Sequence, residues 1–335
     1  MRAARSLLVI KGSGGGMEPR DTAGGCGGVL SSKGPLVSVL MCGYNVEPFV
    51  YDSLRSVLEQ SYASLEVVFI DDGSTDGTAR AVGSFADGRL RYFARPHEGR
   101  GAARAFGVTV CRGDYVAIAD ADDISLPYRI EAQVAYLRAH PGTGVVSGQM
   151  LHFDERHAPH RVVHYPTSDG KVMRMFTRGS MGCSHAAAMM VRSAVIEVGN
   201  YNSAFRASED LDLFLRLKRR YRLANLDVDL VHYRNSGMHV SLSAWFEVCA
   251  FQEYAVYCER IRGNGRVAAP FRTWREGPGV RLRLYTWHSS RLAKMIGTGY
   301  VAVARTAVQK GRERTGAPHD LGVGRRKEGP RGHMR

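Results

Sequence analysis

Residues 36–120 alternate short apolar runs with stretches in which apolar residues recur at helical spacing. The apolar runs predict strands in four places: residues 36–42, 65–71, 89–95 and 114–120. The intervening stretches predict helices in three places: residues 47–60, 76–86 and 98–110. Strands that alternate with helices indicate an α/β fold, in which a mostly parallel sheet is covered by helices on both faces. Ligands of such sheets bind outside the carboxyl ends of the strands.

The fourth strand has an acidic end. The segment 114–123, "DYVAIADADD", begins as a buried strand and finishes with Asp120, Asp122 and Asp123. Carboxylates this close repel one another and raise one another's pKa, which indicates a positive partner. A hard divalent cation, Mg²⁺ or Mn²⁺, that bridges Asp122 to a diphosphate would be such a partner. The structural alternative is a turn that caps the helix expected to begin near Pro127.

Five motifs, taken in order, resemble the family 2 glycosyltransferases with the GT-A fold. They read "VSVLMCGYN", "SVLEQSYASLEVVFIDDGSTDGT", "GRGAARAFGVTVCRGDYVAIADADD", "SEDLDLFLRL" and "HYRNSGMHVS". The resemblance runs from about residue 36 to residue 241. The chain departs from the family pattern at Cys42 and Gly43, where Pro-Thr or Pro-Ala is usual, and at His97 and Ala105, where Asn is usual. These departures concern the contacts to the donor and the choice of sugar.

The resemblance implies a donor site for a nucleotide diphosphate sugar. Asp71 and Asp72 would hold the base and the ribose, although the same segment also suits a turn and helix cap. Asp120 would lie near the ribose, and Asp122 would bind the metal ion directly. Arg104 would either face the diphosphate or pair with a carboxylate at a strand end.

An acceptor site is implied by the later motifs. Asp210 would be the general base that removes a proton from the acceptor hydroxyl, and Glu209 would orient the acceptor or a neighbouring loop. The alternative is that the preceding serine caps a helix whose first turn favours acids. His185 would lie near the acceptor or the donor sugar, unless it is only structural. Arg234 and His239 would close over the diphosphate as part of a mobile loop.

The charge of the chain is unevenly distributed. The formal net charge is +14, and residues 260–335 hold 18 Lys or Arg against 4 Asp or Glu, so residues 1–259 are balanced. The basic end indicates contact with an anionic surface, either membrane lipid or nucleic acid, or else a solvated tail. The balanced body lacks a basic and aromatic platform, which argues against nucleic acid.

Composition divides the chain into four parts. They are a disordered Gly-rich N-terminus (1–35), the glycosyltransferase domain (36–243), a helical extension (244–310) and a basic disordered tail (311–335). An amphipathic helix at 244–260 is expected to pack on the domain. Six scattered cysteines, no visible export signal and no long apolar segment favour a reduced, cytoplasmic compartment, with peripheral contact at the inner face of the membrane through the tail.

The functional prediction combines these observations. We expect an inverting, metal-dependent enzyme that moves a sugar from a nucleotide diphosphate donor, most simply UDP, to a hydroxyl of a glycan, lipid or small molecule. A sugar nucleotidyltransferase is the enzymatic alternative, but "CGYNVEPF" lacks the Gly-rich loop with Arg and Lys that begins those chains. A protein that binds nucleic acid or another anionic surface through its tail is the non-enzymatic alternative.

Overall fold

The computed structural model describes residues 34–154, 157–235 and 242–277. The predicted disordered ends apart from residues 34–35, the predicted helical extension beyond residue 277, and His239 therefore lie outside the described residues. The strands are β1 (Val37–Gly43), β2 (Leu65–Asp71), β3 (Leu90–Ala94), β4 (Tyr115–Asp120), β5 (Ile124–Ser125), β6 (Thr143–Asp154), β7 (His157–His160), β8 (Met189–Val191) and β9 (Arg222–Arg234). The helices are α1 (Glu47–Leu58), α2 (Thr78–Gly83), α3 (Arg100–Val110), α4 (Arg129–Ala139), α5 (Asp169–Thr177), α6 (Arg192–Glu197), α7 (Glu209–Leu217), α8 (Leu242–Gly263) and α9 (Phe271–Glu276).

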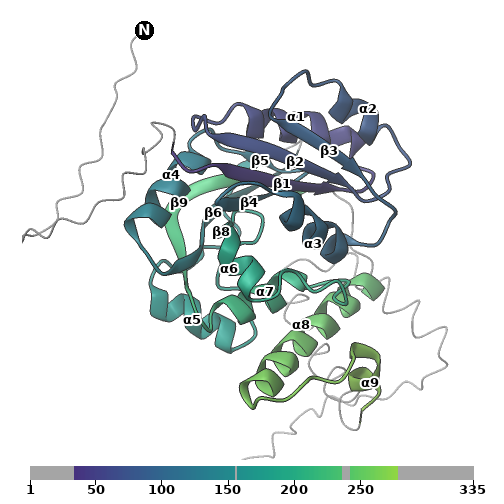
Figure 1. Ribbon diagram of the computed structural model, residues 1–335, viewed down its shortest axis with the longest axis vertical. Helices are drawn as coiled ribbons and strands as arrows, with labels where there is room; N and C mark the ends of the chain where they lie inside the picture. The colour runs from purple at the N-terminus through teal and green to yellow at the C-terminus, as the bar shows by residue number, and fades with distance from the viewer. Residues whose placement is uncertain (1–33, 155–156, 236–241, 278–335) are drawn as a thin grey trace, which may run out of the picture. The chain divides into compact units, whose positions relative to one another are not determined.

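The described strands form one sheet in the order β3-β2-β1-β4-β8-β6-β9-β5 (Figure 1). Strand β7 pairs with β6 beside this order. The first four strands are parallel, so their carboxyl ends meet at one edge. The predicted strands and helices of this half are confirmed to within a few residues. The second half is mixed, because β8 runs antiparallel to both β4 and β6. Arg234 is the last residue of β9, paired with Phe153, and not part of a loop as predicted.

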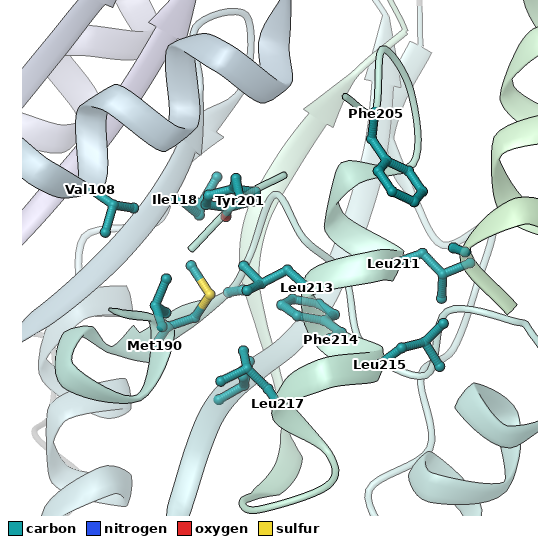
Figure 2. Packing of buried hydrophobic residues seen from close by; sticks show 14 of the residues in the cluster. Val108, Ile118, Met190, Tyr201, Phe205, Leu211, Leu213, Phe214, Leu215 and Leu217 are labelled. Atoms are coloured by element: carbon teal, nitrogen blue, oxygen red, sulfur yellow. The ribbon is translucent and has the colours of Figure 1, made fainter. Parts of the chain in front are cut away.

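Both faces of the sheet are buried. Successive residues of a strand point to opposite sides, so neighbours in β1 belong to different core clusters. Val39 and Met41 of β1 pack in one core cluster with residues of α1, α2 and α4. Leu40, between them, packs in the other with residues of α3, α5, α6 and α7. Figure 2 shows part of that second cluster, where side chains of α3, β4 and β8 lie beside the leucines of α7. Each fully buried aliphatic side chain stabilises the fold by roughly 1.5–3 kcal/mol.

Helix α8 packs against α7, and this confirms the predicted helix at 244–260 and its packing on the domain. Phe251 and Tyr254 of α8 belong to the same core cluster as Leu211 of α7. Asp212 of α7 is fully buried, and its carboxylate accepts hydrogen bonds from Arg216 and Arg262 at 2.9 Å each. The proposed boundary at residue 243 stays a prediction. In the part of the chain that the structure describes, no helix has the length and apolarity needed to cross a bilayer.

Candidate functional site

A cavity of about 370 Å³ lies where the carboxyl end of β4 meets the first turns of α3 and α7. Its lining includes six Arg, Asp, Glu or His residues: Arg100, Arg104, Asp120, His185, Glu209 and Asp210. Five of the six are predicted site residues, drawn from segments far apart in the sequence. The sequence interpretation missed Arg100. The signal that points to it is spacing, because residues four apart on a helix share a face and Arg100 precedes Arg104 by four.

Arg104 joins the two sides of this cavity. One of its terminal nitrogens donates to Asp120 Oδ1 at 3.0 Å, and the other donates to Glu209 Oε1. The arginine is only 6% exposed. Burial by itself would lower its pKa, but the charges of Asp120 and Glu209 outweigh burial and raise it. Of the two sequence-based alternatives for Arg104, pairing with a carboxylate at a strand end is the contact that the structure contains.

Helix α7 begins in an unusual way. Ser208, the residue before it, has a φ of 57° in the left-handed region, a conformation that costs a non-glycine residue roughly 1–2 kcal/mol. Its side chain does not cap the helix, and its Oγ donates to the carbonyl of Val248 on α8 at 3.2 Å. The capping alternative is therefore wrong for this serine. The sharp turn leaves Glu209 and Asp210 at the cavity wall.

Asp210 has the electrostatics of a weak base. Burial, together with the negative charge of Glu209, raises the pKa of Asp210 to about 6, against a partial lowering by Arg104. Its Oδ1 accepts a hydrogen bond from the backbone N–H of Leu211 at 2.7 Å. A carboxylate with a pKa near the working pH is suited to accepting a proton from a hydroxyl.

His185 is buried beside these acids and its Nε2 lies 2.7 Å from the hydroxyl of Tyr201. Burial, and then the charge of Arg104, lowers the pKa of His185 well below its ordinary value. The imidazole is therefore neutral at physiological pH. It can exchange a hydrogen bond with a neighbouring hydroxyl without adding charge to the cavity.

Asp122 and Asp123, which follow β4, are largely removed from solvent although they are charged residues. Burial and the charge of Asp120 raise the pKa of Asp122, and burial raises the pKa of Asp123 well above its usual value. Asp123 Oδ1 accepts from the backbone N–H of Arg234 at 2.9 Å, whereas its Oδ2 is buried without a hydrogen-bond partner. No side chain caps α4, whose N-cap is Tyr128, so the capping alternative is not what this cluster does.

A hard cation would fit this cluster. Crowded, desolvated carboxylates and a buried oxygen without a partner are features that a divalent ion compensates. Among the residues that the structure describes, no group of three or more His, Cys, Asp or Glu side chains is placed to hold a metal ion by itself. Mg²⁺ commonly binds through one or two carboxylates together with substrate phosphates. A cation at Asp122 would therefore share its coordination with a bound diphosphate.

Asp71 and Asp72 are buried, at 3% and 4% exposure, and the protein uses their oxygens. Asp71 accepts from the backbone N–H of Ser74 at 2.7 Å and from the Tyr92 hydroxyl at 2.6 Å. Asp72 accepts from the backbone N–H groups of residues 98 and 99 at 2.9 Å each. The bond from Ser74 is that of the turn alternative, whereas the bonds from Tyr92 and from residues 98–99 tie this segment to β3 and to the start of α3. Each carboxylate oxygen keeps a further lone pair, so a contact to a nucleotide stays a prediction.

An aromatic pair that the sequence interpretation did not identify lies beside Asp72. The ring of Tyr44, 46% exposed, stacks on His97 with centroids 4.1 Å apart. His97 Nδ1 lies 2.9 Å from the carbonyl of Asp72. Gly73 allows this approach, because it has a φ of 81° and a Cβ there would lie 2.7 Å from the nitrogen of His97. The departure from the family pattern at His97 thus places an imidazole where the donor base is expected.

Arg234, at the end of β9, contacts the acidic cluster. Its Nε donates to the carbonyl of Asp122 at 2.9 Å, and its guanidinium carbon lies 4.8 Å from the ring centroid of Phe153. The structure therefore brings Arg104, Asp120, Glu209, Asp210 and His185 around one cavity and places Asp122 and Arg234 next to it. The roles assigned to these residues stay predictions.

Comparison with known proteins identifies the family. The model of Glycosyl transferase family 2 matches residues 38–199. The putative glycosyltransferase EpsE of Bacillus subtilis (strain 168) is 35% identical over 213 residues, which cover 62% of this chain and 75% of EpsE. The amylovoran biosynthesis glycosyltransferase AmsE of Erwinia amylovora is 30% identical over 187 residues, which cover 54% of this chain and 69% of AmsE.

Two solved structures share the fold. Staphylococcus aureus TarS 1–349 in complex with UDP-GlcNAc has a TM-score of 0.53 at 19% identity and covers 66% of each chain. The mannosyltransferase of Pyrobaculum calidifontis in complex with GDP-Man and Mn²⁺ has the same TM-score and identity and covers 85% of this chain and 82% of its own. They confirm the predicted GT-A fold. With the identity to EpsE, these comparisons establish that the chain belongs to glycosyltransferase family 2 and is a transferase of sugars.

Proposed function

We propose that this glycosyltransferase uses a nucleotide diphosphate sugar, with UDP as the expected nucleotide, and inverts the configuration at the transferred sugar. The observation that carries the proposal is Asp210, a carboxylate of raised pKa in the same cavity as Asp120 at the end of β4. Asp210 on one wall of the cavity suits the acceptor hydroxyl. The acidic cluster at the end of β4 suits the donor, so the two substrates would meet in the cavity between them. The structural neighbours bound to UDP-GlcNAc and GDP-Man support a nucleotide-sugar donor.

In this mechanism Asp210 accepts the proton of the acceptor hydroxyl while that oxygen attacks the anomeric carbon. The new carbon–oxygen bond forms as the bond to the diphosphate breaks, and the electron pair leaves with the diphosphate. A single displacement from the opposite face inverts the configuration. Glu209 orients the wall around Asp210 through Arg104, and neutral His185 exchanges a hydrogen bond with the acceptor.

Asp122 would hold the divalent cation, with Asp120 beside it toward the ribose. A bound Mg²⁺ or Mn²⁺ supplies positive charge to the departing diphosphate. Asp71 and Asp72 fix the segment that receives the base and ribose, and the exposed ring of Tyr44 offers the base a stacking surface. Arg234, anchored on the backbone of Asp122, contributes positive charge beside the acidic cluster.

The first experiment is thermal stabilisation of the full chain by nucleotides. UDP and GDP are compared with Mn²⁺ present and with EDTA, and a DNA oligonucleotide serves as the control for the basic tail. We expect stabilisation by at least one nucleoside diphosphate that is lost in EDTA. Stabilisation by DNA and by neither nucleotide would contradict the proposal.

The second experiment is a donor screen that detects release of the nucleoside diphosphate, followed by NMR of the product. Inversion predicts that the anomeric configuration of the product is opposite to that of the donor. Pyrophosphate release from a nucleoside triphosphate and a sugar phosphate would support the nucleotidyltransferase alternative instead. Contact of the basic tail with anionic lipid at the cytoplasmic face also remains a proposal, tested by vesicle binding of the full chain and of a chain ending at residue 310.

A further inference from the structure

The donor site needs a cation that Arg104 does not provide. Its guanidinium is committed to Asp120 on one side and Glu209 on the other, and the side chain is almost fully buried. Moving it onto a diphosphate would leave buried Glu209 and partly exposed Asp120 without their partner, and breaking a buried ion pair typically costs several kcal/mol. Arg104 therefore serves as a fixed link between β4 and α7.

Arg100 lies one helical turn before Arg104 on the same face of α3. Both arginines line the cavity, about 6 Å apart along the helix axis, and the exposed Arg100 lies nearer to solvent than Arg104, which is 6% exposed. Within the described residues the side chain of Arg100 makes no hydrogen bond or ion pair. This arginine is therefore a cation that a ligand can engage without breaking an existing contact.

The charge of Arg100 reaches the acceptor side of the site. Burial is the main influence on the pKa of Asp210 and of His185, and the positive charge of Arg100 lowers both. Arg100 and Asp120 at the end of β4 line the same cavity, so the guanidinium also stands beside the space between that side and β4. A guanidinium can donate two parallel hydrogen bonds to phosphate oxygens, which suits it to a diphosphate in that region.

We propose that Arg100 binds the diphosphate of the donor and stays with it as it leaves. The inference rests on the proposed function, because it needs a nucleoside diphosphate in the cavity. Arg234 approaches the acidic cluster from β9 and is anchored on the backbone of residue 122. The two arginines then flank the diphosphate from separate elements, and Arg100 is the one on the wall shared with Asp210.

The test is calorimetric titration of the full chain with UDP, GDP and UMP in the presence of Mn²⁺. The variants are Arg100→Gln and Arg100→Lys, with Arg112→Gln as the matched control. Arg112 is an exposed arginine just beyond the other end of α3, and its backbone N–H donates to Glu66 Oε1 at 2.7 Å. Circular dichroism checks that each variant is folded.

We expect Arg100→Gln to weaken binding of the nucleoside diphosphate about 10- to 100-fold, the usual effect of losing charge-assisted hydrogen bonds. Arg100→Lys should recover part of this loss, binding of UMP should change less than threefold, and Arg112→Gln should bind like the wild type. The salt dependence of diphosphate binding should also decrease in Arg100→Gln.

Three outcomes would overturn parts of the reasoning, and they are distinguishable. If the wild type binds neither UDP nor GDP, the proposed function fails and the inference fails with it. If the wild type binds and Arg100→Gln binds within twofold of it, only the inference fails. If UMP and UDP are weakened equally, Arg100 contacts the nucleoside part and the diphosphate assignment is wrong.

Discussion

Replacing Glu209 by glutamine tests the electrostatic link between the two halves of the site. Glu209 is one of the two carboxylates that hold buried Arg104, and its charge is the second influence, after burial, that raises the pKa of Asp210. Glutamine keeps the shape and one acceptor oxygen but removes the negative charge. The variant should therefore change both the free energy of unfolding and the pH dependence of catalysis.

The stability effect is bounded by the contacts of Arg104. Removing one partner of a buried ion pair typically costs about 3–5 kcal/mol. Here Arg104 keeps its bond to Asp120, and the glutamine oxygen can still accept a hydrogen bond. Because these contacts remain, we expect a loss of roughly 2–3 kcal/mol, just below that range, measured as a lower urea midpoint at unchanged slope.

The pH effect has a definite sign. Asp210 must be deprotonated to act as a base, so kcat/KM should rise with pH through about 6 and then level off. Glu209→Gln removes a charge that raises this pKa, whereas burial, the larger cause, remains. The acidic limb should move down by roughly 0.5–1 pH unit. The assay is release of the nucleoside diphosphate from the donor found in the screen, between pH 4.5 and 8.

Glu197→Gln is the control, because Glu197 is an exposed carboxylate paired with Arg220 at the surface. It removes the same charge and should leave the acidic limb in place. Asp210→Asn should lower the plateau at least ~10²-fold with donor affinity nearly unchanged. A limb that does not move in Glu209→Gln, or that moves upward, would refute the coupling. Normal turnover of Asp210→Asn would refute the assignment of the base itself.

Three further predictions concern the cation, the donor loop and helix α8. Asp122→Ala should abolish the part of UDP stabilisation that EDTA removes, and equal Mn²⁺ dependence in mutant and wild type in thermal shift would contradict it. Asp72→Asn should cost about 1–3 kcal/mol in urea unfolding, because an amide cannot accept from both N–H groups of residues 98–99. Arg262→Gln should cost about 1–3 kcal/mol by weakening the bond to buried Asp212, and an unchanged urea midpoint would show that α8 is held by packing alone.

The parallel half of the fold could be predicted from sequence because each buried strand ends where its apolar run ends. β2 and β4 show this, since "LEVVFID" and "YVAIAD" are buried almost throughout. The second half could not, because β9 mixes buried and exposed positions and β6 and β9 pair out of sequence order. The sequence of Arg222–Arg234 does not by itself indicate this pairing, because its partner strand β6 lies about 80 residues earlier.

The site residues that belong to sequence motifs could be predicted, whereas the contacts that depend on packing between distant segments could not. The motifs identified Asp120, Glu209 and Asp210, which line one cavity. They did not show that Arg104 is enclosed between two of these carboxylates, because burial of a charged residue depends on how distant segments pack. For the same reason the sequence did not distinguish Arg104 from Arg100, since both belong to one helical face and only depth in the cavity separates them.

The buried carboxylate that joins α7 to α8 has a consequence for engineering. The family match ends at residue 199, yet Asp212 is held partly by Arg262, more than 60 residues beyond that point. A recombinant fragment cut near residue 243 would expose the leucine face of α7 and leave Asp212 with one arginine. Chimeras meant to exchange acceptor preference should therefore transfer α7, α8 and α9 as one cassette ending after residue 277.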